Sequence, residues 1–255
     1  MHSNRRRKFI KDVAGLGFIY PLAHTLASKN NKQTGNDKKL NVVCVGGHPD
    51  DPESGCGGTL LLYAQAGHSV SIVYLTRGEA GIQGKNYQEA AAIRTKESEA
   101  ACKIIGATPY FLGQTDGSTH FDKEAIKNLH ELLQKIKPDI LFTHWPIDTH
   151  PDHQVASLLS YQCWLRMKKS FPIYYFEVDS GFQTMHFSPT DYINITPVAE
   201  QKKRALYQHT SQNPDDIYLN HHLIMQRFRG REINAGEAEA FVRLDAYAHE
   251  IKDNS

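Results

Sequence analysis

Two short motifs concentrate side chains that bind metal ions and transfer protons. The first, His-Pro-Asp-Asp, occupies residues 48–51, and the second, His-Pro-Asp-His, occupies residues 150–153. Imidazole and carboxylate groups are the ligands of catalytic zinc sites, in which three protein ligands leave one coordination position open for water. A neighbouring carboxylate or imidazole that is not a ligand can act as general base or acid. The two motifs therefore indicate metal-dependent hydrolysis.

The spacing of these residues suggests a role for each. His48 and Asp51 are three residues apart, so a helix that begins at the end of the motif allows both side chains to face one cation. His153 is the best third ligand, and it completes a set of two histidines and one carboxylate. Asp50 points in a different direction from Asp51 and is the candidate general base. His150 faces the same cavity as a second acid or hydrogen-bond donor.

Each motif taken alone has a simpler explanation. A His-x-x-His pair is commonly a surface feature, and an Asp-Asp pair before a helix commonly caps its N-terminus. The position of the motifs favours the metal site, because both follow directly after apolar segments that are predicted to be strands. In open α/β sheets the ligand crevice lies outside the carboxyl ends of the strands, so the two motifs are expected to meet there.

Predicted strands and helices alternate along the chain. We predict strands at residues 40–45, 70–75, 110–112, 140–143 and 173–178, and helices at residues 59–66, 88–105, 123–136 and 155–167. This alternation predicts an α/β fold whose mostly parallel sheet is covered by helices on both faces. The sequence has no glycine-rich dinucleotide motif, no P-loop and no G-x-S-x-G nucleophile motif. The four cysteines have no C-x-x-C spacing, and we expect buried free thiols.

Composition and the N-terminus limit the classes of function. Lys and Arg number 29 against 28 Asp and Glu, and this balance argues against a protein that binds nucleic acid through charge. Residues 6–11, Arg-Arg-Lys-Phe-Ile-Lys, precede an apolar stretch with small residues, as in a twin-arginine export signal. We expect an export signal at residues 1–27, a polar linker at 28–39 and a single domain at 40–255. The mature protein is then periplasmic or otherwise exported, and it is cytoplasmic if the signal is not used.

Several further segments accompany the two motifs. They lie at residues 42–47, 55–59, 75–81, 94–97 and 112–117, with looser matches at 209–212 and 238–241. Together with both motifs they resemble the PIG-L/LmbE family of zinc-dependent N-deacetylases. This resemblance implies a Rossmann-like three-layer sandwich and the removal of an N-acetyl group, often from an N-acetylglucosamine-type sugar or conjugate. The cation it implies is zinc, with ferrous iron as the alternative.

The resemblance also assigns roles to residues. His48, Asp51 and His153 correspond to the metal ligands and Asp50 to the general base. His150 corresponds to the residue that stabilises the tetrahedral intermediate or protonates the leaving amine.

Two further positions and one departure concern the substrate and the ligands. Arg94 and Asp116 fall where the family tends to place substrate contacts. The family often has Glu directly after the Asp pair, whereas this chain has Pro52 there and Glu53 next. Proline suits the first turn of a helix, and the role of Glu53 is left open.

Other functions remain compatible with the motifs. Two histidines and one carboxylate also form the metal site of non-haem Fe(II) oxygenases. A non-catalytic periplasmic protein that binds sugar or metal is the second alternative, although it would have no use for Asp50. No stretch after the N-terminal segment approaches the roughly 20 apolar residues of a membrane span, so we expect no stable span in the mature form. Assembly into a homo-oligomer is left open.

Overall fold

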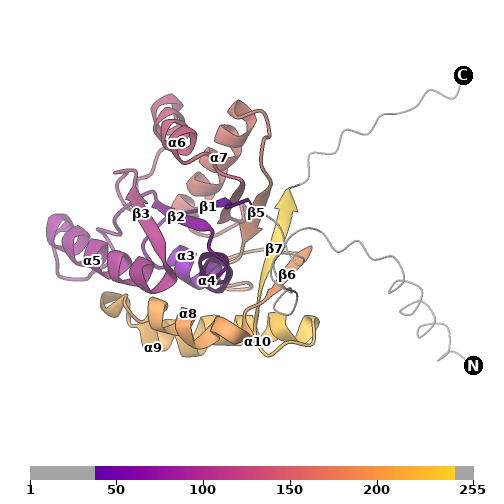
Figure 1. Ribbon diagram of the computed structural model, residues 1–255. Helices are drawn as coiled ribbons and strands as arrows, with labels where there is room; N and C mark the ends of the chain where they lie inside the picture. The colour runs from indigo at the N-terminus through magenta and orange to yellow at the C-terminus, as the bar shows by residue number, and fades with distance from the viewer. Residues whose placement is uncertain (1–37, 245–255) are drawn as a thin grey trace, which may run out of the picture. The chain divides into compact units, whose positions relative to one another are not determined.

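A seven-stranded sheet with the strand order β3-β2-β1-β4-β5-β7-β6 lies at the centre of the computed structural model, which describes residues 38–244 (Figure 1). The strands are β1 (Asn41–Gly46), β2 (Ser69–Tyr74), β3 (Ala107–Phe111), β4 (Ile140–His144), β5 (Ile173–Phe176), β6 (Asp191–Asn194) and β7 (Ala238–Leu244). Strands β1 to β5 are parallel, whereas β7 is antiparallel to both β5 and β6. The predicted mostly parallel sheet is confirmed.

Helices cover both faces of this sheet, which gives the expected three layers. The helices are α3 (Asp51–Gly55), α4 (Gly57–Gln65), α5 (Tyr87–Ile105), α6 (Lys123–Ile136), α7 (Pro151–Arg166), α8 (Ala199–Leu206), α9 (Pro214–Ile217) and α10 (Leu223–Glu232), with short turns η1 (Thr196–Val198), η2 (Thr210–Gln212) and η3 (Tyr218–His222). Helices α6 and α7 pack together on one face, and α3, α4 and α5 pack on the other, where α8 contacts all three (Figure 1).

Local sequence signals set the ends of the long helices. The side chain of Asn86 accepts a hydrogen bond from the Glu89 amide at the start of α5, and Gly106 ends that helix at a φ of 83°. Asp122 caps α6 in the same way through the Ala125 amide. These caps satisfy amide groups that have no partner within the helix. The predicted bounds of α5 and α6 therefore agree closely with the structure.

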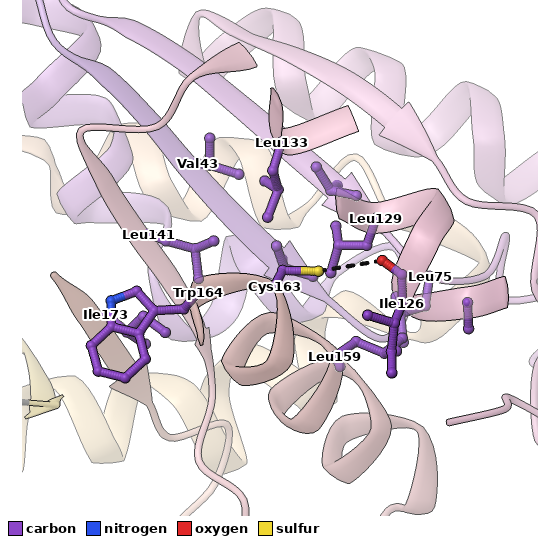
Figure 2. Packing of buried hydrophobic residues seen from close by; sticks show 14 of the residues in the cluster. Val43, Leu75, Ile126, Leu129, Leu133, Leu141, Leu159, Cys163, Trp164 and Ile173 are labelled. Atoms are coloured by element: carbon purple, nitrogen blue, oxygen red, sulfur yellow. Dashed lines mark hydrogen bonds between the residues drawn. The ribbon is translucent and has the colours of Figure 1, made fainter. Parts of the chain in front are cut away.

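The main apolar core lies between the sheet and the pair α6–α7 (Figure 2). Val43 of β1 and Leu141 of β4 are fully buried there against Leu129 of α6 and Leu159 of α7. Helix spacing puts the buried residues of α6 on one side, which leaves its charged residues toward solvent. The expected buried free thiols are confirmed at Cys44, Cys56, Cys102 and Cys163.

The strand order places the two motifs side by side. From β1 the chain proceeds to β2 and β3 on one side, whereas β4 and β5 lie on the other side of β1. The order of connection therefore reverses between β1 and β4, which pair directly with Val45 opposite Thr143. The His48–Asp51 motif follows β1, and the His150–His153 motif follows β4 through a short loop. The two motifs therefore meet at the carboxyl ends of the strands, where the ligand crevice is predicted.

The chain after residue 178 extends the sheet and covers the α3–α5 layer. Strand β7 carries Glu239, whose carboxylate accepts hydrogen bonds from the amides of Gly58 (2.8 Å) and Thr59 (2.7 Å) in the first turn of α4. The ammonium group of Lys202 in α8 lies 2.7 Å from the same carboxylate. Glu239 thus connects β7, α4 and α8.

Residues 1–27, the predicted export signal, and residues 28–37 of the predicted linker lie outside the described residues. Among the helices within residues 38–244, none combines the length and the apolar character that crossing a bilayer requires.

Candidate active site

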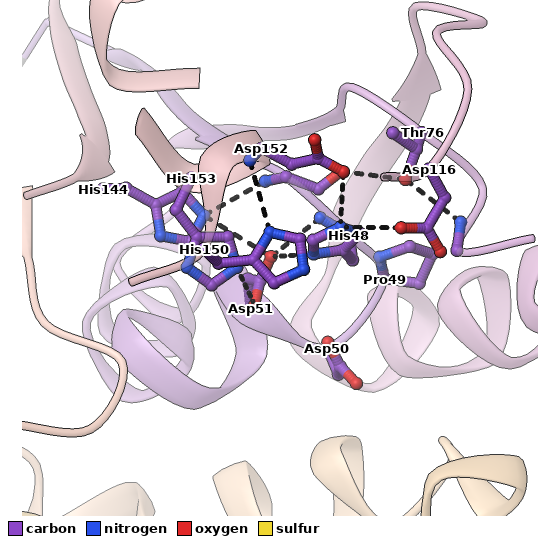
Figure 3. Close-up of polar contacts among 12 residues, drawn as sticks. His48, Pro49, Asp50, Asp51, Thr76, Asp116, His144, His150, Asp152 and His153 are labelled. Atoms are coloured by element: carbon purple, nitrogen blue, oxygen red, sulfur yellow. Dashed lines mark hydrogen bonds and ion pairs between the residues drawn. The ribbon is translucent and has the colours of Figure 1, made fainter. Parts of the chain in front are cut away.

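His48 lies at the end of β1 and is surrounded by carboxylates (Figure 3). Its amide donates to Asp51 Oδ2 at 2.7 Å, and its Nδ1 lies 3.1 Å from the same oxygen. Its Nε2 lies 3.0 Å from Asp152 Oδ2 and 3.2 Å from Asp116 Oδ1. Burial acts to lower the pKa of His48, but the hydrogen bonds with Asp116, Asp152 and Asp51 outweigh it and raise the pKa well above its usual value. The ring is therefore fixed by contacts at both nitrogens.

Asp51, the first residue of α3, joins the two motifs. Its Oδ1 lies 3.2 Å from His153 Nε2, and its Oδ2 lies 3.4 Å from His144 Nε2. Burial would raise the pKa of Asp51, but His153 and His144 hold it well below its usual value. Burial acts to lower the pKa of His153, but the carboxylates of Asp51 and Asp148 outweigh it and raise the pKa to about 9. Asp51 thus contacts both of the other residues predicted as metal ligands.

Imidazole and carboxylate groups of the kind that bind divalent cations lie close together and buried here. Asp51 faces both His48 Nδ1 and His153 Nε2, but the ligand atoms of these three residues do not all lie within 4.8 Å of one another. The other nitrogen of each ring faces a second carboxylate, namely Asp152 for His48 and Asp148 for His153, at 3.0 and 3.1 Å. Metal-binding histidines are typically held by a carboxylate in this way, which fixes the ring and its tautomer. The His and Asp groups here could therefore hold a metal ion.

Neighbouring donors allow other ligand sets. Ligand atoms of His48, His150 and His153 lie within 4.8 Å of one another, and so do those of Asp51, His144 and His153. His144, the last residue of β4, is fully buried and its Nε2 accepts the Gly47 amide hydrogen at 3.0 Å. Burial and His153 lower the pKa of His144 to about 4. This neutral ring orients the loop after β1, and sequence reasoning missed it because it ends an otherwise apolar strand.

Asp50, the candidate base, lies apart from the imidazole rings in Figure 3 and lines the same cavity. Its φ of 107° is a conformation that L-residues rarely adopt. Arg94 Nη2 donates to Asp50 Oδ2 at 3.0 Å and also to the carbonyl oxygen of Pro49. Burial raises the pKa of Asp50, and the positive charge of Arg94 offsets part of this rise. The buried arginine therefore holds the unusual turn in place.

Arg94 and Asp116, expected as substrate contacts, both line the cavity but already have partners in the protein. Arg94 Nη1 donates to the Gly78 carbonyl oxygen at 3.3 Å. Gly78 has a φ of 66°, and a Cβ there would lie 2.2 Å from Arg94 Nη1, so only glycine fits. Asp116 accepts from the Ala80 amide at 3.0 Å and contacts His48. Their role toward a substrate stays a prediction.

His150 is the N-cap of α7, and its Nδ1 accepts a hydrogen bond from the Asp152 amide at 3.2 Å. A neutral ring that accepts at Nδ1 carries its proton on Nε2. Burial and the neighbouring His48 lower the pKa of His150, which favours this neutral form. His150 is half-buried and lines the cavity, so the arrangement leaves Nε2–H as the donor that can act there.

Glu53 and Asp152 complete the support of the site. Glu53 is fully buried, accepts from the Asp50 amide at 3.2 Å and from the Tyr74 hydroxyl at 2.5 Å. The carboxylate after Pro52 thus steadies the backbone of the candidate base. Asp152 accepts from the Gly117 amide at 2.8 Å and from Thr119 Oγ1 at 2.7 Å. Asp152 belongs to the second motif, but its contact with His48 depends on the fold and was not predicted from the sequence.

A cavity of about 520 Å³ opens over these residues, a volume in the range of sites for small molecules. One side is formed by the two motifs with Arg94 and Asp116. Another part of the lining comes from the later chain and includes Val178, Asp179, Phe182, Gln183, Gln212, Ile217, His221 and His222.

Comparisons with known proteins agree with the geometry. The model of the PIG-L family, described as GlcNAc-PI de-N-acetylase, matches residues 43–164, which contain both motifs. Diacetylchitobiose deacetylase of Thermococcus kodakarensis is 30% identical over 198 residues, covering 72% of this chain and 73% of that protein. The structure of N,N'-diacetylchitobiose deacetylase from Pyrococcus horikoshii is similar, with a TM-score of 0.73, 24% identity, and coverage of 96% and 93%.

A relative with another activity is also similar. The 4-oxalmesaconate hydratase of Pseudomonas putida is 24% identical over 190 residues, covering 67% of this chain and 73% of the hydratase. The stronger match in sequence is with the deacetylase of Thermococcus kodakarensis, and the family model spans the metal-site motifs. The chain belongs to the PIG-L/LmbE family of deacetylases.

Proposed function

We propose that this protein is a metal-dependent N-deacetylase that hydrolyses the acetamido group of an N-acetylglucosamine-type sugar or conjugate. The observation that carries the proposal is the meeting of both motifs at one cavity, where Asp51 contacts His48 and His153. Asp50 and His150 line the same cavity, and the ring of His150 lies beside those of His48 and His153. The deacetylase activity of a relative with 30% identity supports the same reaction class.

We propose that His48, Asp51 and His153 bind the cation, with zinc as the expected ion and ferrous iron as the alternative. A bound divalent cation acts as a Lewis acid toward the acetyl carbonyl and the attacking water. The carboxylates of Asp152 and Asp148 hold the two rings so that one nitrogen of each stays directed at Asp51.

Asp50 and His150 carry out the proton transfer and the stabilisation of the oxyanion in this proposal. Asp50 accepts the proton of the water as its oxygen bonds to the acetyl carbon, and Arg94 keeps the carboxylate aimed. His150 donates from Nε2 toward the carbonyl oxygen as negative charge develops there. When the C–N bond breaks, the amine nitrogen takes up the proton that Asp50 accepted from the water, and acetate and the free amino sugar leave.

The proposal is tested by acetate release from N-acetylglucosamine and N,N'-diacetylchitobiose, with and without a chelator. Asp50→Asn should keep the metal and lose turnover by about 10²–10⁴-fold, because an amide does not accept the proton. Glu131→Gln, an exposed acid-to-amide change on α6, is the matched control and should behave as wild type. Full turnover by Asp50→Asn would exclude Asp50 as the base.

The same assays separate the alternatives. A non-haem oxygenase consumes O₂, and a hydratase adds water to a C=C bond without releasing acetate. A sugar-binding or metal-binding protein takes up ligand without turnover. Acetate release that needs the metal but no O₂ would exclude all three as the main activity on these sugars.

We also propose that residues 1–27 direct export to the periplasm. The support is the arginine pair followed by an apolar stretch in the sequence. Replacing Arg6 and Arg7 by lysine should leave the protein in the cytoplasm of its native host, as measured by fractionation. Unchanged export of this double variant would contradict a twin-arginine route.

A further inference from the structure

The part of the cavity lining that comes from the later chain carries three residues that the proposed reaction does not use. Asp179 and Phe182 come from the loop after β5, and His221 comes from η3. We call these three residues the outer wall. They lie within the later part of the chain, beyond the residues that the family model matches.

Asp179 fixes the imidazole of His221. His221 Nδ1 lies 2.6 Å from Asp179 Oδ2. The loop that holds Asp179 is itself closed, because the carbonyl oxygen of Asp179 accepts from the amides of Gln183 (2.8 Å) and Thr184 (2.9 Å). A ring whose Nδ1–H is held by a carboxylate presents the lone pair of Nε2 as a hydrogen-bond acceptor.

The Nε2 atom of His221 has no hydrogen-bond partner among residues 38–244. The side chain is about one-third exposed, at 34%, and lines the cavity. Elsewhere in the lining, Arg94 donates to Asp50 and Asp116 accepts from the Ala80 amide. His221 Nε2 is therefore an acceptor left for a ligand, whereas His150 Nε2 is the donor assigned to the reaction.

Phe182 gives the outer wall an apolar surface. Its side chain is 75% exposed, although it lines the cavity, and its ring centroid lies 5.6 Å from that of His221. Aromatic rings combined with a few fixed polar groups are typical of sites for small ligands. The C–H groups of one face of a pyranose ring are apolar, whereas its hydroxyl groups donate and accept hydrogen bonds.

We infer that the outer wall binds the hydroxylated ring of the substrate, with His221 Nε2 accepting from a ring hydroxyl and Phe182 packing against the apolar face. In this assignment Asp179 is a positioning residue, since it acts through His221. The inference deepens the proposed function and rests on it, because it concerns how the same cavity recognises a sugar.

The test compares KM and kcat for N-acetylglucosamine in single variants. His221→Ala should raise KM about 3- to 10-fold, as expected for one lost hydrogen bond, and leave kcat within about twofold. Phe182→Ala should raise KM in the same direction. Asp179→Asn should raise KM less than His221→Ala does, and His221→Gln, which offers a carbonyl acceptor, should recover part of the loss.

Two variants outside the cavity serve as matched controls for the His221→Ala and Phe182→Ala changes. His130→Ala alters a partly exposed histidine of α6, and Phe121→Ala removes an aromatic ring that is 45% exposed. Both should keep the KM of wild type. An unchanged KM in both His221→Ala and Phe182→Ala would overturn the inference, as would a fall in kcat without a rise in KM.

A binding measurement separates this inference from the proposed reaction. If wild type releases no acetate, the deacetylase proposal fails, and calorimetric titration with N-acetylglucosamine still tests the outer wall. Weaker binding by His221→Ala and Phe182→Ala than by the two controls would support it. Equal binding by all variants, or no binding by wild type, would overturn it.

Discussion

The guanidinium of Arg94 lies 3.0 Å from the carboxylate of Asp50, although 44 residues separate them in the sequence. Arg94 is 3% exposed, and the same Nη2 also donates to the Pro49 carbonyl oxygen. A non-glycine residue in such a rare backbone conformation costs roughly 1–3 kcal/mol. The turn that carries the candidate base therefore depends on an arginine from α5.

Arg94→Lys should lower kcat by about 10²-fold, because a point charge cannot hold the carboxylate and the turn together, and small displacements of a reacting group are costly. Metal content should stay at the wild-type level. Arg166→Lys at the exposed end of α7 is the matched control. A rise in KM alone would instead support the substrate contact that the family resemblance implies for Arg94.

Asp148→Asn should weaken metal binding by about 10- to 100-fold, since Asp148 fixes the ring of His153 through Nδ1 at 3.1 Å. Alanine at His48, Asp51 or His153 should remove most of the metal. Competition with a chelator of known affinity measures both effects. Full occupancy in the three alanine variants would show that the cation binds elsewhere.

His150→Ala should lower kcat by about 10²–10³-fold while metal content is unchanged, because the ring is placed to donate to the developing oxyanion. Metal analysis and kinetics on one preparation separate this role from that of a ligand. Parallel loss of metal and activity would favour the set of His48, His150 and His153, whose nitrogens lie within 4.8 Å.

Glu239→Ala should cost about 3–5 kcal/mol of unfolding free energy, because it leaves the buried ammonium of Lys202 without its partner. It also leaves the Gly58 and Thr59 amides unpaired. Urea unfolding measures the loss. Adding Lys202→Met should recover part of it, and strictly additive effects in this double-mutant cycle would contradict the coupling.

The sequence was sufficient where local signals are strong. The apolar runs before the two motifs predicted β1 and β4, and an amphipathic pattern predicted α6 at residues 123–136. The start of α3 at Asp51, beside Pro52, follows from the same reasoning. Because two parallel strands end at one edge of a sheet, the meeting of the motifs could be predicted without coordinates.

Tertiary contacts decide what the sequence left open. Strand β6 has four residues, of which only Ile193 is buried, so its pairing with β7 rather than its own pattern makes it a strand. Nothing local to Asp148 or Glu53 reveals that each orients a group of the site. The pairing of Asp50 with Arg94 likewise depends on how α5 packs, and the spacing of residues in the sequence does not predict that packing.

The two borders of the sheet bear on how copies of this chain can associate. At one border β3 has Pro109 at its centre, which has no amide hydrogen to offer an incoming strand. At the other, β6 is only four residues long. Short or proline-containing border strands oppose the edge-to-edge growth that leads to aggregates. Within residues 38–244, a continuous sheet across subunits is therefore disfavoured at both borders, which favours contacts between copies through helices or loops.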